Sequence, residues 1–587
     1  MTDQAKKTIH FVSLGCPKNR VDTEVMLGVS DQAGYELVSA PEQAEVIVVN
    51  TCGFVEAAKQ ESIDTIFELA QWKNEGRCEK LVVAGCLSQR YSSELASEMP
   101  EVDYFLGSSD MLKLGAVLKA DAEHPQARML VGNPADYVYR QSDPRRLSGA
   151  QHSAYVKIAE GCSRRCSFCA IPGFRGNQRS RPVHDVVAEV ERLCDAGTVE
   201  INLVSQDTIS YGRDLDPRSS LAELVRALLD VRKLRWLRLF YLYPEKLDAP
   251  LLELFATAAD GGKLVPYLDI PFQHASDAML KRMRRGYNAR RQRDFLTEVR
   301  SRVPGVFIRS AFIVGHPGET EQDFQELCEL VKTSELDHVG VFRYSHEEGT
   351  HSASLPELVD KKTIERRARE LMKLQRAVSK RKLRALIGQE LDVLVEGESD
   401  ESELLLVGRH AGQAPEVDGR VHLINGTAQP GEIRRVRITH SADYDLVGDL
   451  SLGQDDPLRP EGAAPVRPRV KKPRLRVLGT SSASVAETAC RRGAQWAILP
   501  TSAGSAEQST KWAQKRGKRD CAACCKSCAH ASGAAISPRQ ACSCASSRLH
   551  CPVVICSEIC RAVRVAMCSV RTLASSMSCS GPARQAM

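Results

Sequence analysis

Short apolar runs alternate with helical patterns over the first 120 residues, and this alternation limits the possible folds more than any other feature. Three runs rich in valine and isoleucine are "TIHFVSLGC", "AEVIVVNTC" and "KLVVAGC". Such runs are typical of parallel strands that are buried on both faces. The helical patterns that follow them are "RVDTEVMLGVSDQAG", "FVEAAKQESIDTIFELAQW" and "SQRYSSELASEM". The alternation predicts an α/β domain over residues 8–125, built on a doubly wound parallel sheet.

A second series of strands and helices follows a linker near residues 125–152. Its candidate strands are "SAYVKIAEG", "EINLVSQD", "LRWLRLFYL", "VPYLDIPF", "VFIRSAFIVG" and "HVGVFRYS". With the helices between them they predict a central partial (β/α) barrel, which we place at residues 148–378. Sites in such folds lie at the C-terminal ends of the strands. A long basic helix is expected over residues 361–387, with Ile364, Ala368, Leu371 and Leu374 spaced for one face.

After this helix the hydrophobic pattern changes from the helical period to the alternation of short strands, which are separated by glycine turns. We predict a small antiparallel β-barrel and assign it to residues 379–450. Residues 388–450 hold 13 Asp and Glu against 5 Arg and no Lys. An acidic module would repel RNA phosphates and attract a basic protein. The basic helix at 361–387 points the other way, as a candidate RNA contact.

Residues 451–587 lack any sustained periodicity. Twelve of the 21 cysteines lie after residue 458, where 21 Lys and Arg stand against 5 Asp and Glu. We interpret this irregular, low-order, basic and cysteine-rich tail as the product of a shifted reading frame or a lost stop codon. The rival interpretation is a natural disordered extension that contacts RNA.

The compartment decides how the cysteines are interpreted. No apolar run approaches the roughly 20 residues of a membrane span, and "MTDQAKKTIHFVSLGC" does not resemble a signal peptide. We therefore expect a cytoplasmic, reducing location with no membrane association. Clustered cysteines there are metal ligands or catalytic groups rather than disulfides.

The stretch "AEGCSRRCSFCAIPG" places Cys162, Cys166 and Cys169 within eight residues, after a predicted strand. Three thiolates are one short of a tetrahedral zinc site and one short of the four irons in a [4Fe–4S] cluster. A structural zinc site with a borrowed fourth ligand is one interpretation. The other is an iron–sulfur cluster with one open iron, which is free to bind a substrate.

A second set of three cysteines is spread through the N-terminal region. Cys16, Cys52 and Cys86 each come directly after one of the three apolar strands. Because the carboxyl ends of parallel strands share one edge, where open α/β folds bind ligands, the three thiols are expected to converge. A second cluster with three protein ligands explains this placement better than three unrelated buried thiols.

The central motif resembles the radical S-adenosylmethionine superfamily, in which an aromatic residue, here Phe168, precedes the last cysteine. The resemblance implies that the open iron chelates S-adenosylmethionine and that the cofactor is cleaved to a radical. Two sets of three cysteines and a terminal small barrel, similar to a TRAM domain, resemble the methylthiotransferases over residues 8–450. The implied cofactors are two [4Fe–4S] clusters and S-adenosylmethionine.

Two stretches, "SQDTISYGRD" and "YLDIPFQHASDAMLKRMRRG", resemble the RimO branch of this family. The resemblance implies methylthiolation of the β-carbon of an aspartate in ribosomal protein uS12, with S-adenosylmethionine as radical source and methyl donor. The implied partners are uS12, free or in the small ribosomal subunit, and an electron donor, with RNA contact secondary at most. The alternatives are a MiaB-like methylthiotransferase acting on tRNA adenosine, and a non-catalytic iron–sulfur or zinc scaffold on the ribosome.

The resemblance also implies residue roles. The six cysteines would be the cluster ligands, and no other catalytic residue is expected. Candidate cofactor contacts at strand ends are Phe168, Ser205, Gln206, Gln273 and Gly315.

Some residues are expected to have no role in the site. Cys78, Cys194 and Cys328 lie outside the motifs and are interpreted as bystanders. His316 and His346 stand where the family is expected to have Phe and Pro. We expect neither to touch a cysteine motif.

Overall fold

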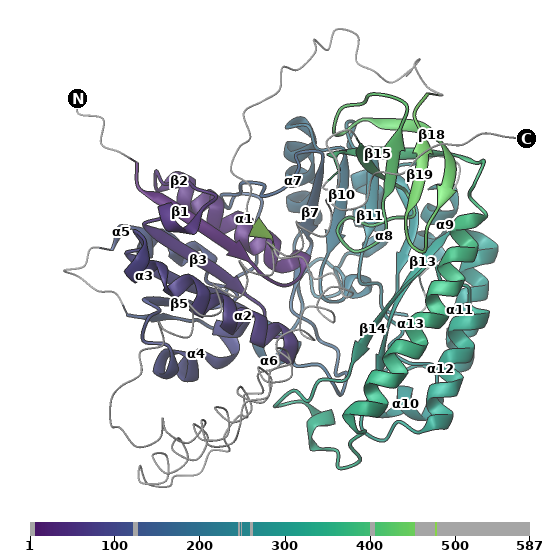
Figure 1. Cartoon of the computed structure of the whole chain (residues 1–587), viewed down its shortest axis with the longest axis horizontal. Coiled ribbons are helices and arrows are strands. Elements are labelled where there is room, and N and C mark those ends of the chain that lie inside the picture. Colours follow the sequence, from purple (N-terminus) through teal and green to yellow (C-terminus); the bar gives the residue numbers. More distant parts are fainter. Residues whose placement is uncertain are drawn as a thin grey trace, which may run out of the picture. The chain divides into compact units, whose positions relative to one another are not determined.

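The structure is a computed structural model that describes residues 6–120, 127–244, 247, 249–258, 262–399, 405–451 and 476–477. The N-terminal part contains one parallel sheet in the strand order β2-β1-β3-β4-β5-β6 (Figure 1). Its strands are β1 (Thr8–Ser13), β2 (Glu36–Leu37), β3 (Val46–Thr51), β4 (Lys80–Gly85), β5 (Tyr104–Leu106) and β6 (Met129–Leu130).

Helices cover both faces of this sheet. They are α1 (Pro17–Gln32), α2 (Glu56–Ala70), α3 (Trp72–Glu75), α4 (Cys86–Glu98) and α5 (Leu114–Lys119), with short 3-10 turns at Pro41–Gln43 and Met111–Lys113. Successive residues of β3 enter different cores: Val48 packs in one with Val25 of α1, and Val49 in the other with Leu69 of α2. Two-sided burial is why these strands are continuous apolar runs. The predicted doubly wound parallel sheet is confirmed.

The central part contains a six-stranded parallel sheet in the order β14-β13-β12-β11-β10-β7. The two edge strands do not pair with each other, so the barrel is partial, as predicted. The strands are β7 (Ser153–Lys157), β10 (Glu200–Val204), β11 (Trp236–Leu239), β12 (Leu264–Asp269), β13 (Phe307–Val314) and β14 (His338–Arg343). A separate antiparallel pair, β8 (Ala159–Glu160) and β9 (Arg179–Ser180), frames the cysteine loop.

Helices cover one face of the central sheet and enclose one large hydrophobic core with it. The helices that contribute to this core are α7 (Val183–Asp195), α8 (Leu221–Leu229), α9 (Ala249–Ala258), α11 (Ala289–Arg302), α12 (Glu321–Thr333) and α13 (Lys361–Arg384). Two short helices, α6 (Ile171–Arg175) and α10 (Asp277–Arg282), contribute no residue to it, and 3-10 turns lie at Pro134–Asp136, Thr208–Ser210 and His351–Ser354.

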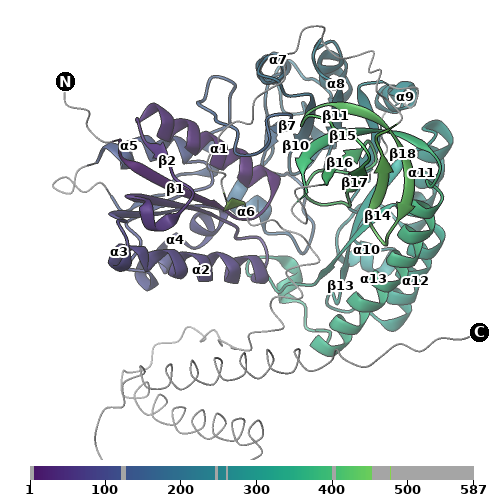
Figure 2. The ribbon, with the colours of Figure 1, turned by 45° about the horizontal axis from the view of Figure 1, so that its top comes forward.

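The long helix α13 lies beside α12 (Figures 1 and 2). Ala368 and Leu371 are buried, and Ile364 and Leu374 pack against the same core, as their spacing predicts. The helix continues to Arg384, past residue 378 where we place the end of the central domain.

The predicted small barrel closes in the order β15-β16-β17-β19-β18, and Figure 2 shows it as a ring of strands. Its strands are β15 (Glu390–Glu398), β16 (Leu406–His410), β17 (Val421–Ile424), β18 (Ile433–Ser441) and β19 (Leu446–Asp449). One pairing departs from the antiparallel expectation, because β17 and β19 run parallel. The reason lies in the chain path, since β18 intervenes and β19 returns beside β17 in the same direction.

A buried charge cluster joins the small barrel to the central sheet. Arg409 of β16 contacts Glu200 of β10 at 2.6 Å, and Arg238 of β11 contacts the same carboxylate at 3.2 Å. Tyr155 and Tyr267 donate hydrogen bonds to Pro415 and Asp418 beside the barrel. The barrel is thus fixed to the inner face of the central strands.

None of the described helices is long and apolar enough to cross a membrane. The predictions for the tail lie outside the described residues, apart from Ser451 and the strand β20 (Arg476–Val477), which pairs in parallel with the end of β1.

Candidate functional site

The three N-terminal cysteines share one edge of their sheet. Cys16 and Cys86 stand at the starts of α1 and α4, and Cys52 follows β3. A Cβ placed on Gly15, whose φ is +91°, would lie 3.3 Å from Sγ of Cys52. A Cβ placed on Gly53 would lie 2.8 Å from the carbonyl oxygen of Cys86. The strand order reverses between β1 and β3, which is where open α/β sheets bind ligands. The three cysteines lie at this end of the sheet, and their role as cluster ligands stays a prediction.

Polar side chains from two domains surround the buried Cys86. Its thiol lies 3.4 Å from Oδ1 of Asn19 on α1. Arg175 of α6 donates from Nη2 to that Oδ1 at 2.6 Å and to Sγ of Cys86 at 3.0 Å. Asn19 in turn donates to the carbonyl oxygens of Leu14 and Thr51 at the ends of β1 and β3. The edge of the N-terminal sheet is therefore tied to a helix that follows the central cysteine loop.

The central cysteines lie in a loop held by backbone hydrogen bonds. The Cys162 amide donates to the Gly176 carbonyl at 3.0 Å, and the Cys169 amide donates to the Cys166 carbonyl at 3.2 Å. Arg285 donates from Nη1 to Sγ of Cys166 at 3.2 Å. The structure therefore places a buried arginine against one thiol in each set of three.

Burial controls the acidity of these thiols. It raises the pKa of Cys162 to about 11 and that of Cys169 to about 12, although backbone hydrogen bonds from Arg164 and Ile171 oppose the shift. Burial also raises the pKa of Cys52 and Cys86, and Arg175 opposes the shift at Cys86. These four thiols, when free, are protonated near neutral pH, so a bound metal centre must displace their protons.

The arrangement fits a multi-iron cluster better than a zinc ion. Within the described ranges, no three or more His, Cys, Asp or Glu side chains converge on a point that would hold a single metal ion. Structural zinc needs four ligands at about 2.0–2.3 Å from one centre. A [4Fe–4S] cluster instead binds each thiolate through a different iron, so the sulfurs stand farther apart. Each set supplies three thiols, which is one short of the four ligands of a closed zinc site.

A buried ion cluster lies between the two sets of cysteines. Lys157 contacts Glu160 at 2.7 Å and also pairs with Asp22 of α1. Arg175 contacts Asp22 and Glu160 at 3.0 Å each. Two cations thus balance two carboxylates away from water. Burial by itself would raise the pKa of Glu160, but Arg175 and Lys157 hold it far below its usual range.

The predicted cofactor contacts occupy different environments. Phe168 packs against Met279, Met283 and Ile313 at the end of β13. The buried Ser205 hydroxyl pairs with Thr208 at 3.0 Å within its own turn. Gln206 donates to Glu160 at 2.8 Å, and its own Oε1 is buried with no hydrogen-bond partner.

The two remaining predicted contacts lie at the ends of β12 and β13. Gln273 has φ +74° and forms a bridge to Phe312. At Gly315, a Cβ would lie 2.3 Å from Cγ1 of Ile364 on α13. The close approach of that helix accounts for glycine here, and cofactor contact by these residues stays a prediction.

Two pockets of the central part differ in their relation to these residues. A pocket of about 330 Å³ lies beside the cysteine loop, and its lining includes Ser163, Gln178 and Asp207. Both amide atoms of Gln178 and Oδ1 of Asp207 are buried with no hydrogen-bond partner. Sequence reasoning missed both residues as ligand-binding candidates, although Asp207 directly follows the Ser205–Gln206 pair.

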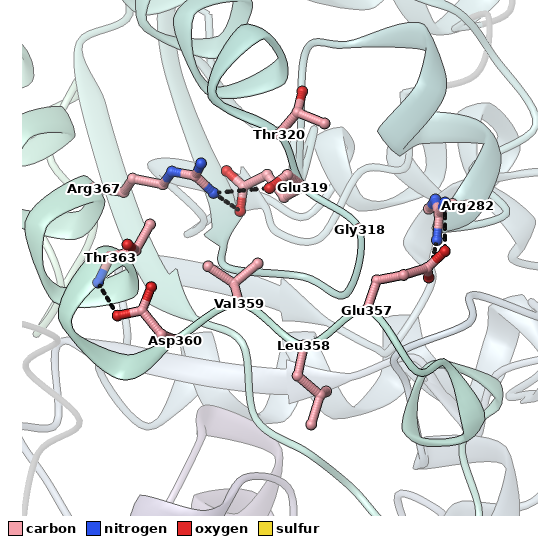
Figure 3. Close-up of a pocket in the computed structure, with 10 residues that line it drawn as sticks. All are labelled: Arg282, Gly318, Glu319, Thr320, Glu357, Leu358, Val359, Asp360, Thr363 and Arg367. Atoms are coloured by element: carbon pink, nitrogen blue, oxygen red, sulfur yellow. Dashed lines mark hydrogen bonds and ion pairs between the residues drawn. The ribbon is translucent and has the colours of Figure 1, made fainter.

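The other pocket, of about 640 Å³, lies between the starts of α12 and α13 (Figure 3). Its lining includes none of the predicted site residues, although Gly318 lies three residues after Gly315 in the sequence. Figure 3 shows its charges already paired, Arg367 with Glu319 and Arg282 with Glu357.

His316 corrects one expectation. Its Nε2 lies 2.7 Å from the Ser352 hydroxyl and 3.5 Å from the hydroxyl of Ser167, which stands between Cys166 and Phe168. The expectation that His316 does not touch a cysteine motif is wrong, because the loop after β13 folds back against the cysteine loop. Burial lowers the pKa of His316 to about 4, so the ring is neutral at physiological pH.

The three other cysteines of the described residues lie in hydrophobic cores. Cys78 packs in the N-terminal core with α2, and Cys194 and Cys328 pack in the central core. Burial raises the pKa of all three to about 11. These environments suit thiols that serve only packing.

Comparisons with known proteins assign the three folded parts. The uncharacterized protein family UPF0004 matches residues 8–107, the radical SAM superfamily matches 156–331, and the TRAM domain matches 387–450. Among solved structures, the radical S-adenosylmethionine methyltransferase TsrM from Kitasatospora setae covers 57% of this chain and 73% of its own at TM-score 0.41 and 16% identity.

Curated relatives match over most of their length. "Ribosomal protein uS12 methylthiotransferase RimO" of Sorangium cellulosum is 58% identical over 78% of this chain and 94% of its own. The protein of the same name from Myxococcus xanthus is 48% identical over 79% of this chain and 96% of its own. Identity at this level over nearly whole relatives shows family membership. The chain therefore belongs to the RimO family of ribosomal protein uS12 methylthiotransferases, radical S-adenosylmethionine enzymes that use [4Fe–4S] clusters.

Proposed function

We propose that this chain attaches a methylthio group to the β-carbon of an aspartate in ribosomal protein uS12. The observation that carries the proposal is the pair of cysteine sets, one at the edge of the N-terminal sheet and one in the loop after β8, bridged by Arg175. Removing hydrogen from an unactivated carbon requires radical chemistry. The sulfur that is attached to this carbon must come from a second site close by.

Cys162, Cys166 and Cys169 would hold one cluster, and Cys16, Cys52 and Cys86 would hold the other. Each set leaves one of four irons without a protein ligand. When bound, the clusters and S-adenosylmethionine supply one-electron radical chemistry, a transferable sulfur and a methyl group.

The chain's own residues bind and orient the reactants. Gln178 and Asp207 line the pocket beside the cysteine loop, and together they have one buried donor and two buried acceptors without a hydrogen-bond partner. The unpartnered Oε1 of Gln206 adds a further acceptor, and Glu160 holds the other end of that amide. The ion cluster of Asp22, Lys157, Glu160 and Arg175 fixes the two sets of cysteines relative to each other and excludes water between them.

Charge on the small barrel supports a basic protein as substrate. Acidic residues outnumber arginines by 13 to 5 over residues 388–450. Arg435 and Arg437 are engaged across the sheet by Glu390 and Asp392, which lowers the number of free cations on that face. A surface of this kind attracts a basic protein and disfavours RNA phosphate.

The tRNA alternative gains little from the basic helix α13. Several of its cations already pair with carboxylates: Arg366 with Glu321, Arg381 with Glu335, and Lys382 with Asp337. Such pairing weakens a phosphate-binding face.

The proposed reaction also needs a one-electron donor and reducing conditions, which agree with a cytoplasmic location.

Mass spectrometry of uS12 from a strain lacking the gene tests the proposal. We expect the aspartate of uS12 to be unmodified while the methylthio groups of tRNA are intact. Restoration by the wild-type gene, but not by a C162A variant, ties the modification to the central cysteines. Intact uS12 modification together with lost tRNA modification would contradict the proposal.

A further inference from the structure

Arg285 is a buried cation that lies against a cysteine of the central set. It follows α10, and only 3% of its surface is exposed. Its guanidinium donates from Nη1 to Sγ of Cys166 at 3.2 Å and from Nη2 to the Pro271 carbonyl at 2.7 Å. Nε lies 3.4 Å from the hydroxyl of Tyr287. These contacts orient the planar guanidinium group of Arg285 toward the cysteine loop.

Arg285 differs from the other buried arginines in its lack of a carboxylate partner. Six arginines are buried among the described residues. Five of them pair with at least one carboxylate: Arg175, Arg181, Arg238, Arg367 and Arg409. No carboxylate of the described ranges forms an ion pair with Arg285.

The aromatic rings around Arg285 do not supply the missing negative charge. The guanidinium stacks over Tyr243, 4.2 Å from the ring centroid, and lies 5.7 Å from that of Tyr287. Burial raises the pKa of both tyrosines above their ordinary range, so both phenols are neutral at physiological pH. A buried cation without an anion is strongly unfavourable, and ring faces offset only part of the cost.

We propose that Arg285 is the counter-cation of the metal centre on Cys162, Cys166 and Cys169, and that it makes this centre easier to reduce. The inference rests on the proposed ligand assignment. Arg285 acts through Cys166 and is a positioning residue. When the centre takes one electron from a one-electron donor, its negative charge rises by one, and the adjacent guanidinium stabilises that added charge without losing a proton. A hydrogen bond to a ligand sulfur acts in the same direction.

Arg175, at the other set of cysteines, differs from Arg285 because it has carboxylate partners. It also donates to a thiol, but Asp22 and Glu160 already neutralise it together with Lys157. Arg175 therefore adds little net charge to its centre, whereas Arg285 adds a full unit.

The test uses full-length protein in which Cys16, Cys52 and Cys86 are replaced by alanine, so that a single centre remains. Arg285→Met and Arg285→Lys are compared in this background after anaerobic reconstitution. The reduction midpoint is followed by electron paramagnetic resonance with dithionite as reductant, without S-adenosylmethionine. Arg284→Met is the matched control, because it removes the same charge from an exposed side chain one residue away.

We expect Arg285→Met to shift the midpoint to more negative potential, Arg285→Lys to give a smaller shift, and Arg284→Met to give none. An unchanged midpoint in Arg285→Met at full iron content would overturn the proposal. Weaker binding of S-adenosylmethionine with an unchanged midpoint would also overturn it and would make Arg285 a cofactor-binding residue instead. If the background protein itself binds no iron, the ligand assignment fails, which is a separate result.

The metal-free protein provides a second readout if Arg285→Met does not retain iron. Without the centre Arg285 has no anionic partner, so replacing it by methionine should leave the urea midpoint of metal-free protein unchanged or raised. Arg181→Met is the comparison, because Arg181 pairs with Glu189 and its loss should lower that midpoint. Equal lowering by both variants would contradict the proposal.

Discussion

Arg175 donates a hydrogen bond to the sulfur of Cys86 over 3.0 Å, although the two residues belong to different domains. The same guanidinium contacts Glu160 at 3.0 Å, directly before the central cysteine loop. One side chain therefore spans the gap between the two sets of cysteines. This buried polar contact ties the two sets of cysteines to each other.

Replacing Arg175 by methionine should destabilise the metal-free protein by about 3–5 kcal/mol, because it leaves Asp22 and Glu160 with Lys157 as their only buried cation. Urea unfolding gives the free energy. Arg146→Met is the matched control: Arg146 pairs with Asp31 at the surface, so we expect a loss of about 0–1 kcal/mol. Equal losses in the two variants would show that the buried cluster does not join the domains.

His316 should make the stability depend on pH below about 6.5, the ordinary value for histidine. Its folded pKa of about 4 is set by burial. Between these values the unfolded chain binds a proton that the folded chain does not, so stability falls as the pH falls. The full loss amounts to about 3 kcal/mol.

Urea unfolding at pH 7.5 and pH 5 measures this dependence. His316→Phe should show a smaller loss of stability between the two conditions than the wild type. His184→Gln, which replaces an exposed histidine, should behave like the wild type. A His316→Phe protein with the wild-type loss would mean that another group carries the dependence.

Gly315→Ala should destabilise the central domain through two separate effects. The left-handed backbone at φ +81° costs about 1–2 kcal/mol for alanine, and the collision with Ile364 adds about 1–3 kcal/mol. Gly305→Ala is the control, since Gly305 has φ +70° and nothing lies within 4 Å of its Cβ position. The Gly315→Ala/Ile364→Ala pair should recover the collision part by the measured free energy of unfolding. No recovery would place the cost in the backbone alone.

Sequence reasoning predicted the three folded parts and both sets of cysteines because their signals are local. Continuous apolar runs mark strands such as β3 and β4, and Cys52 and Cys86 stand at the first position after them. The long-range polar contacts could not be predicted. Glu160, Arg175 and Arg285 resemble surface residues in the sequence, and only the packing of distant segments buries them. His316 was missed for the same reason, since the loop that brings it to Ser167 is set by tertiary structure.

Removal of residues 456–587 should leave methylthiotransferase activity unchanged. The family matches end at residue 450, and the folded parts end with β19 at Asp449 apart from β20. Turnover of uS12 by the shortened chain is the measurement. Lost modification by a shortened chain that still binds iron would show that the tail is a functional extension.

The central claim is tested most directly by reaction of purified, anaerobically reconstituted protein with uS12, S-adenosylmethionine, dithionite and inorganic sulfide, with the mass of uS12 as the readout. The wild type should hold about eight irons and add one methylthio group to one aspartate. The C16A/C52A/C86A variant should cleave S-adenosylmethionine without modifying uS12, and the C162A/C166A/C169A variant should do neither. Unmodified uS12 in the wild-type reaction, together with methylthiolation of a tRNA adenosine when tRNA replaces uS12, would contradict the account.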